Sequence, residues 1–129
     1  MNAIDSKQRA ATAREHLAVA RERLEVADIA PGPSEMAQVA ASNAILSGIA
    51  AADAICGTVL GECSSDPDHR AASQMLRRVQ GADGLAAKLQ QLVADKTAIQ
   101  YGGYCTNSVA RASVARAEAL VNALQQHGL

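Results

Sequence analysis

Two charged side chains, Asp53 and Lys96, lie within otherwise apolar helical stripes of this sequence. Apolar residues recur around both at alternating steps of three and four residues, which is the spacing of one helix face. His69 begins a third such stripe. Carboxylate, ammonium and imidazole groups hold phosphate or transfer protons, so these three residues are the first candidates for a functional site. The stripes comprise Leu46, Ile49, Asp53, Cys56 and Leu60; Leu85, Leu89, Leu92, Lys96 and Ile99; and His69, Ala72, Leu76 and Val79.

Burying an unpaired carboxylate or ammonium costs roughly several kcal/mol. We therefore expect Asp53 and Lys96 to have partners, and each could be the partner of the other. Structural interpretations are also open. Asp53 could form an ion pair or an interface contact, and Lys96, in a last helical turn, could reach out of its stripe along a flexible stem. His69 near a helix start could be a partly exposed polar residue.

The only two tyrosines of the chain lie close together, and the chain has neither Phe nor Trp. Tyr101 and Tyr104 flank a glycine pair in the segment DKTAIQYGGYCTNS. The glycine pair is too short to cradle a phosphate alone, and it is typical of a helix end and turn. The tyrosines either close the end of the bundle with their hydroxyls in water or contribute to a ligand site beside Lys96.

Helices must position these residues, because alanine, the strongest helix former, is the commonest residue in the chain. We expect an all-α fold, an up-and-down bundle of four to five antiparallel helices in a single domain, 1–129. If the helices from the second to the fifth alternate in direction, all the candidate residues lie at or near one pole of the bundle. The predicted helices cover about 5–28, 35–60, 67–79, 84–100 and 107–126, with Ser34 as the N-cap of the second. The polar set at the pole comprises Asp53, Cys63, His69, Lys96, Tyr101, Tyr104, Cys105, Asn107 and Arg111.

The composition excludes several classes of protein. A formal net charge of −1 removes the long-range attraction to phosphate that general nucleic-acid coating requires. Three cysteines without C-x-x-C spacing argue against a disulfide scaffold and a structural zinc site. We expect no metal and no cofactor, because the common nucleotide, hydrolase and metal motifs are missing. Without a leader or a bilayer-long apolar run, the expected location is the cytoplasm. A small alanine-rich core favours a homodimer.

The pattern of segments resembles the HEPN domain, a family named for nucleotide binding in higher eukaryotes and prokaryotes. ASNAILSGIAAADAICG is similar to the second helix of the family, with an inward acid at Asp53. HRAASQMLRR resembles its third helix, LQQLVADKTAIQYGG the end of its fourth, and NSVARASVARAEALVNAL its last. The likeness covers most of the chain, from about Met36 to Leu124, through largely apolar signatures.

The resemblance implies a helical bundle that forms homodimers. Active members are RNases with an Arg, four to six residues, then a His that is often followed by Tyr, and many act as toxins or pair with nucleotidyltransferases. At the matching positions this chain has Lys96 and Tyr101. Tyrosine normally titrates near pH ~10, so it does not suit proton transfer near neutral pH, and lysine lacks the two-pronged geometry of arginine.

Three functions remain open from the sequence. The first is a non-catalytic HEPN-like dimer that binds a nucleotide, another phosphate ligand or a protein partner. Its binding residues would be Asp53, Lys96, Tyr101 and Tyr104. The protein partner could be a nucleotidyltransferase or another member of a toxin–antitoxin pair. The second is a weak, metal-independent RNase that uses Lys96 with Tyr101 or His69 on RNA. The third is a structural helical adaptor in which the polar stripe residues fix helix register or dimer pairing.

Overall fold

The computed structural model describes residues 3–29, 32–64, 70–101 and 105–129. Within them the chain forms five α-helices, a short 3₁₀ helix and no β-strand. The all-α prediction is therefore confirmed. The helices are α1 (Ala3–Ala27), α2 (Glu35–Val59), α3 (Arg70–Arg77), α4 (Asp83–Tyr101) and α5 (Asn107–Asn122), followed by η1 (Ala123–His127).

The predicted boundaries agree with the structure at most helix ends. Ser34 caps α2 as predicted, because its hydroxyl oxygen accepts a hydrogen bond from the Ala37 N–H at 3.1 Å. Thr106 caps α5 in the same way through the Val109 N–H. The last predicted helix is too long, because regular α-helix ends at Asn122 and the chain continues as η1. The predicted start of the third helix lies outside the described residues.

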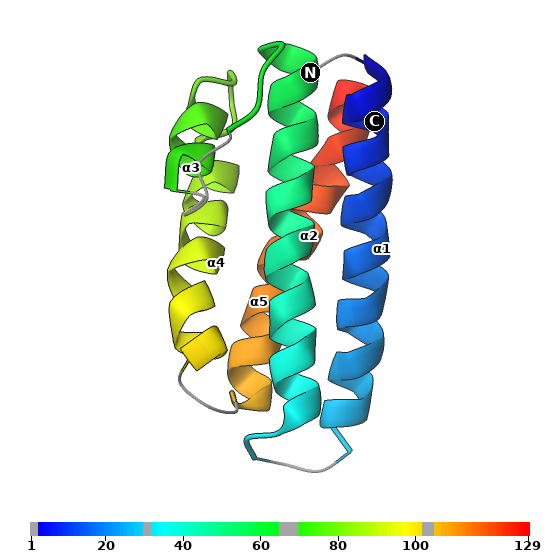
Figure 1. Ribbon diagram of the computed structural model, residues 1–129, viewed down its shortest axis with the longest axis vertical. Coiled ribbons are helices and arrows are strands. Elements are labelled where there is room, and N and C mark those ends of the chain that lie inside the picture. Colours follow the sequence, from blue (N-terminus) through cyan, green and yellow to red (C-terminus); the bar gives the residue numbers. More distant parts are fainter. Residues whose placement is uncertain (1–2, 30–31, 65–69, 102–104) are drawn as a thin grey trace.

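Helices α1, α2, α4 and α5 run alternately down and up, and α3 lies beside the first part of α4 (Figure 1). Side-chain pairs fix these directions. Gln38 near the start of α2 contacts Ile99 near the end of α4, so the two helices are antiparallel. Arg78 directly after α3 pairs with Glu62 shortly after α2, so α3 runs in the same direction as α2. The up-and-down bundle is confirmed, but α3 does not take part in the predicted alternation.

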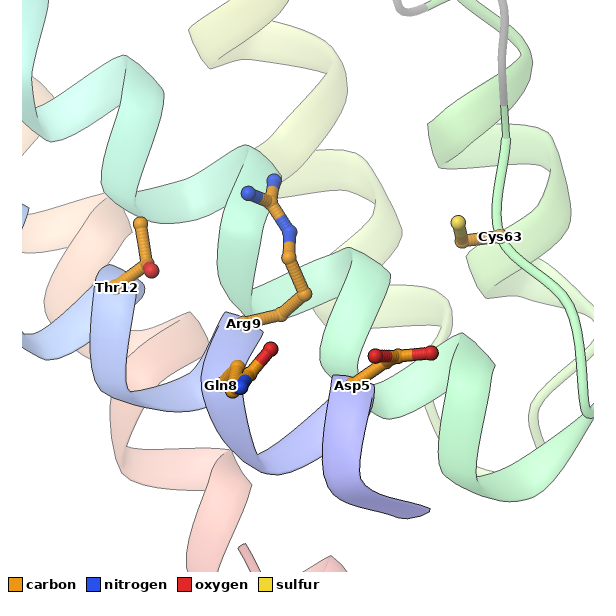
Figure 2. Close-up of a pocket in the computed structure, with 5 residues that line it drawn as sticks. All are labelled: Asp5, Gln8, Arg9, Thr12 and Cys63. Carbon is orange, nitrogen blue, oxygen red and sulfur yellow. The ribbon is translucent and has the colours of Figure 1, made fainter. Parts of the chain in front are cut away.

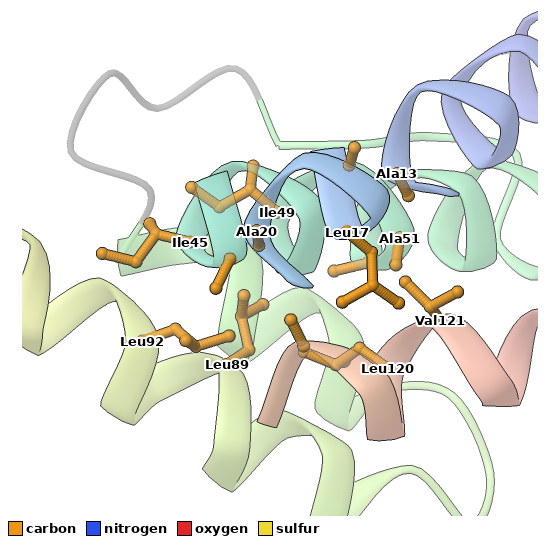
Figure 3. Packing of buried hydrophobic residues seen from close by; sticks show 14 of the residues in the cluster. Ala13, Leu17, Ala20, Ile45, Ile49, Ala51, Leu89, Leu92, Leu120 and Val121 are labelled. Atoms are coloured by element: carbon orange, nitrogen blue, oxygen red, sulfur yellow. The ribbon is translucent and has the colours of Figure 1, made fainter. Parts of the chain in front are cut away.

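The core is built mainly from alanine, with leucines at the points where α4 and α5 meet α2 (Figure 3). Leu89 and Leu92 from α4 and Leu120 from α5 are fully buried. A Cβ atom built on Gly48 would lie 2.6 Å from Leu92 Cδ1 and 3.2 Å from Leu120 Cδ1, which is closer than packed carbons approach. The missing side chain at Gly48 therefore sets how closely the three helices approach.

Helix α2 is the most apolar element of the bundle. We expected no segment long and apolar enough to cross a bilayer, and by length and composition that expectation is wrong for α2. Within its most apolar 18-residue window, 72% of the residues are buried inside the bundle. Contact with the four other helices accounts for this composition, since a helix covered on most sides needs apolar residues on most sides.

Candidate functional site

The candidate residues lie at two opposite ends of the bundle. We call the end formed by the start of α1 and the ends of α2 and α3 the terminal end, and the other the junction end. At the junction end Asn107 Nδ2 donates a hydrogen bond to the Ala27 carbonyl at 2.8 Å. There too, the Cys105 carbonyl accepts a hydrogen bond from the Ser34 N–H at 3.2 Å. Asp53, near the end of α2, lies toward the terminal end. The prediction of a single polar pole is therefore wrong. Because α3 runs parallel to α2, α4 runs antiparallel to α2, whereas strict alternation would have made α4 parallel to it.

Asp53 lies in the apolar stripe as predicted, but its partner is Arg9. Arg9 Nη2 lies 3.0 Å from Asp53 Oδ2, with 37% and 14% of the two side chains exposed. Asp53 does not pair with Lys96, which the sequence had left as one possibility, since Lys96 lies near the opposite end of an antiparallel helix. Arg9 precedes the inward residue Ala13 by one helical turn, and this spacing is the signal by which the sequence could have indicated it.

The Arg9–Asp53 pair should show up as an energetic coupling in a double-mutant cycle. We expect Arg9→Ala and Asp53→Ala to be coupled by about 1 kcal/mol in the free energy of unfolding, as for a half-exposed, charge-assisted hydrogen bond. Urea unfolding of the four proteins measures this value. The same cycle with Lys96→Met in place of Arg9→Ala should give no coupling, and a coupling there as large as that with Arg9 would contradict the assigned pair.

Cys56 follows Asp53 by one turn and is buried. Burial, together with the nearby Asp53 carboxylate, raises the pKa of the Cys56 thiol from 9.0 to about 12. Burial also raises the pKa of Cys105. All three cysteines, including Cys63, are free thiols. A thiol that stays protonated is a poor nucleophile, so Cys56 is a core residue, as its stripe position predicts.

An open depression of about 570 Å³ lies at the terminal end, between α1 and the chain that follows α2 (Figure 2). Its lining contains a carboxylate and a guanidinium, of opposite charge, with an amide, a hydroxyl and a thiol. Opposite charges side by side do not create a field that selects an anion. The lining residues are Asp5, Gln8, Arg9, Thr12 and Cys63. The described residues also contain no group of three His, Cys, Asp or Glu side chains that could hold a metal ion.

Lys96 is half-buried on the inward stripe of α4, between the buried residues Leu92 and Ile99. None of the ion pairs formed within the described part of the chain includes Lys96. Its neighbour Asp95 pairs instead with Arg116, at 3.3 Å. The stripe prediction for Lys96 is thus confirmed, and its ammonium has no described carboxylate partner.

The structure describes the other candidate residues only in part. Tyr101 is the last residue of α4, and the structure describes its backbone but not its side chain. Tyr104 and His69 lie outside the described residues. Cys105 and Asn107 do lie at the junction end, together with Arg111, which pairs with Asp28 at 2.7 Å. Lys96 and Tyr101 therefore share the end of α4, as their spacing requires.

Sequence reasoning missed one residue at the junction end, Gln38. Its side-chain Nε2 donates a hydrogen bond to the Ile99 carbonyl at 3.0 Å. The last four carbonyls of a helix have no partner within that helix, so a contact of this kind stabilises a helix end. Nothing in the spacing of the sequence indicates which glutamine meets which helix end, because the contact joins positions 61 residues apart.

A scan against models of protein families gives no match, and searches of the curated proteins and of the solved structures give no significant match either. The class that the fold defines is an all-helical bundle of five helices. Its function has to be argued from the geometry of its two ends. The terminal end holds the Arg9–Asp53 pair. The junction end holds the Arg111–Asp28 pair and Lys96, which forms no ion pair among the described residues and lies on the same helix as Tyr101.

Proposed function

We propose that this chain is a non-catalytic, HEPN-like domain that acts as a cytoplasmic homodimer and binds a nucleotide or other phosphate-bearing ligand at the junction end. The five-helix bundle and the order of its segments support the likeness to the HEPN family. Helix α4 ends with Lys96 and Tyr101 at the positions where an active member has Arg and His. A nucleotidyltransferase or another member of a toxin–antitoxin pair is the proposed class of protein partner.

The observation that carries the proposal is the state of Lys96. Two partly buried arginines are neutralised, Arg9 by Asp53 and Arg116 by Asp95. A third, Arg23 near the end of α1, contacts the Met36 sulfur at 3.9 Å and takes part in none of the ion pairs of the described residues. Lys96 is half-buried without such a neighbour among the described residues. A cation held partly out of water attracts an anion more strongly than one on an open surface, because the effective dielectric constant is lower. Phosphate is the anion that a compact ammonium group binds in many nucleotide sites.

Catalysis is not proposed, because the junction end lacks a described group that transfers protons near neutral pH. Asp53 is removed from the candidate ligand site by its position near the terminal end. Of the described histidines, His16 contacts Asn43 midway along α1 at 3.3 Å, and His127 follows α5 in η1. Tyr101 replaces the histidine of the active family members, and a phenol with an ordinary pKa near ~10 stays protonated at pH ~7.

The test is to titrate ADP and inorganic phosphate into the protein and measure the dissociation constant by calorimetry. Lys96→Met keeps the apolar stem and removes the charge, so we expect it to weaken binding about tenfold or more, as loss of a charge-assisted contact does. Lys88→Met is the matched control, since Lys88 is an exposed residue of the same helix. It should leave the dissociation constant within about twofold, as a solvated surface charge contributes little.

Two results would reject the phosphate site. One is no heat of binding with either ADP or phosphate for the unmodified protein. The other is equal loss of affinity in the Lys96 and Lys88 variants, which would mean that only general surface charge is involved. Tyr101→Phe then distinguishes a tyrosine that contacts the ligand from one that only closes the end of the bundle. Loss of a hydroxyl that contacts the ligand lowers affinity without lowering stability.

A further inference from the structure

The first turn of α2 holds both flanks of the segment that carries the two tyrosines. We infer that Gln38 is a positioning residue for the proposed Lys96 site. It acts by fixing the end of α4, while Ser34 fixes the start of the chain that leads into α5. The inference rests on the proposed function for its ligand, but the anchoring itself is visible in the hydrogen bonds of the described residues.

The first anchor is the bond from Gln38 to α4. Gln38 Nε2 lies 3.0 Å from the Ile99 carbonyl oxygen, and Gln38 is half-buried. Ile99 is buried and lies in the last turn of α4. The carbonyl groups of a last turn accept no hydrogen bond from an N–H of the same helix. Lys96 precedes Ile99 by three residues on the same stripe. A contact that holds the Ile99 carbonyl therefore also holds the turn from which Lys96 projects.

The second anchor is the backbone of Ser34. Its N–H donates to the Cys105 carbonyl at 3.2 Å, and the two residues form an isolated antiparallel bridge. Ser34 is itself held, because its hydroxyl caps α2 through the Ala37 N–H. Cys105 leads directly into Thr106, which caps α5. The start of α5 is thus attached to the start of α2 by a main-chain hydrogen bond.

The two anchors lie close together. Ser34 and Gln38 are four residues apart, which is about 6 Å along a helix axis. Ile99 and Cys105, which precede and follow residues 100–104, are both hydrogen-bonded to this one turn of α2. Fixing both flanks in the free protein removes part of the ordering cost that a ligand would otherwise meet on binding. Gln38 is the more easily tested anchor, since its contact depends on a side chain.

The test compares Gln38→Leu with Gln91→Leu, the same change at an exposed residue of α4. We expect Gln38→Leu to speed amide hydrogen exchange about tenfold in the last turn of α4, residues 98–101, the effect of losing one hydrogen bond. It should weaken ADP binding by a similar factor. Gln91→Leu should change neither quantity. Unchanged exchange in the last turn of α4 in Gln38→Leu would overturn the inference.

A charge variant gives a readout that a loss of packing would not move. Above its pKa near ~4.3 the carboxylate of Gln38→Glu can only accept hydrogen bonds, and it would face the negative end of the α4 dipole. Exchange in the last turn should therefore be fast at pH ~7. It should slow relative to Gln38→Leu when the carboxyl is protonated and can donate. If the ratio of the exchange rates of Gln38→Glu and Gln38→Leu does not change with pH, this result counts against the Gln38 contact.

The exchange and binding measurements fail separately. If the unmodified protein binds neither ADP nor phosphate while Gln38→Leu still loosens the end of α4, the proposed function fails and the anchoring stands. If ADP binds and depends on Lys96, but neither exchange nor affinity responds to Gln38→Leu, the proposed function stands and Gln38 is not a positioning residue.

Discussion

Leu92→Ala is expected to lower the free energy of unfolding by about 2–5 kcal/mol, the range for removing a buried leucine side chain from a packed core. Leu92 has no exposed surface and its Cδ1 lies over Gly48, where α2 offers no side chain to fill the space. Leu89 and Leu120, its neighbours, are also fully buried, so they cannot relax into the gap without opening others. The upper part of the range is therefore the expected result.

Urea unfolding followed by circular dichroism measures this loss. Leu85→Ala is the matched control, because Leu85 lies on the same stripe of α4 but is only half-buried. Its loss should be clearly smaller, since less apolar area returns to water. If Leu92→Ala costs no more than Leu85→Ala, Leu92 is not packed between α2 and α5 as described.

Gly48→Val is expected to destabilise the protein by about 2 kcal/mol, because it overfills the same contact. The new Cβ would be placed 2.6 Å from Leu92 Cδ1 and 3.2 Å from Leu120 Cδ1. Removing a helical glycine gains only a few tenths of a kcal/mol when valine replaces it, roughly, because valine is itself a weak helix former. The overlapped atoms are the ends of two leucine side chains that are themselves fully buried, so we expect steric overlap to decide the sign.

The control is Gly84→Val, at a helical glycine of α4 whose Cβ would meet nothing within 4 Å. It should be neutral or slightly stabilising by chemical denaturation. The penalty of Gly48→Val should also shrink by about 1 kcal/mol or more in a Leu92→Ala background, as for two residues that share one space. Simple additivity of the two changes would show that residue 48 and Leu92 do not compete for this volume.

The helices themselves could be predicted, because alanine content and the steps of three and four residues define them locally. The direction of α3 could not. The chain between α2 and α3 covers residues 60–69, and ten extended residues can reach about 33 Å. The eight residues of α3 span only about 12 Å. A connection longer than its helix permits either direction, and the alternation that placed all polar residues at one pole had no physical basis at that point.

The candidate site was predicted in its parts and not in its assembly. The stripe positions of Asp53 and Lys96 follow from local spacing, and both are confirmed. Their partners depend on which helices meet, and α1 contributes four arginines from which spacing alone does not select Arg9. The contact of Gln38 with Ile99 could not be predicted at all, since it depends on the antiparallel arrangement of α2 and α4 and no pattern in either segment indicates it.

The two anchors on the first turn of α2 have a consequence for how this protein can vary. Because Ile99 and Cys105 are each bonded to that turn, the bundle is closed on both sides of residues 100–104 by contacts those residues do not supply. Substitutions within residues 100–104 therefore leave both of these hydrogen-bonding partners in place. The first turn of α2 thus separates two requirements: it holds the end of α4 and the start of α5 in place, while the sequence of residues 100–104 is free to be set by what this end of the bundle binds.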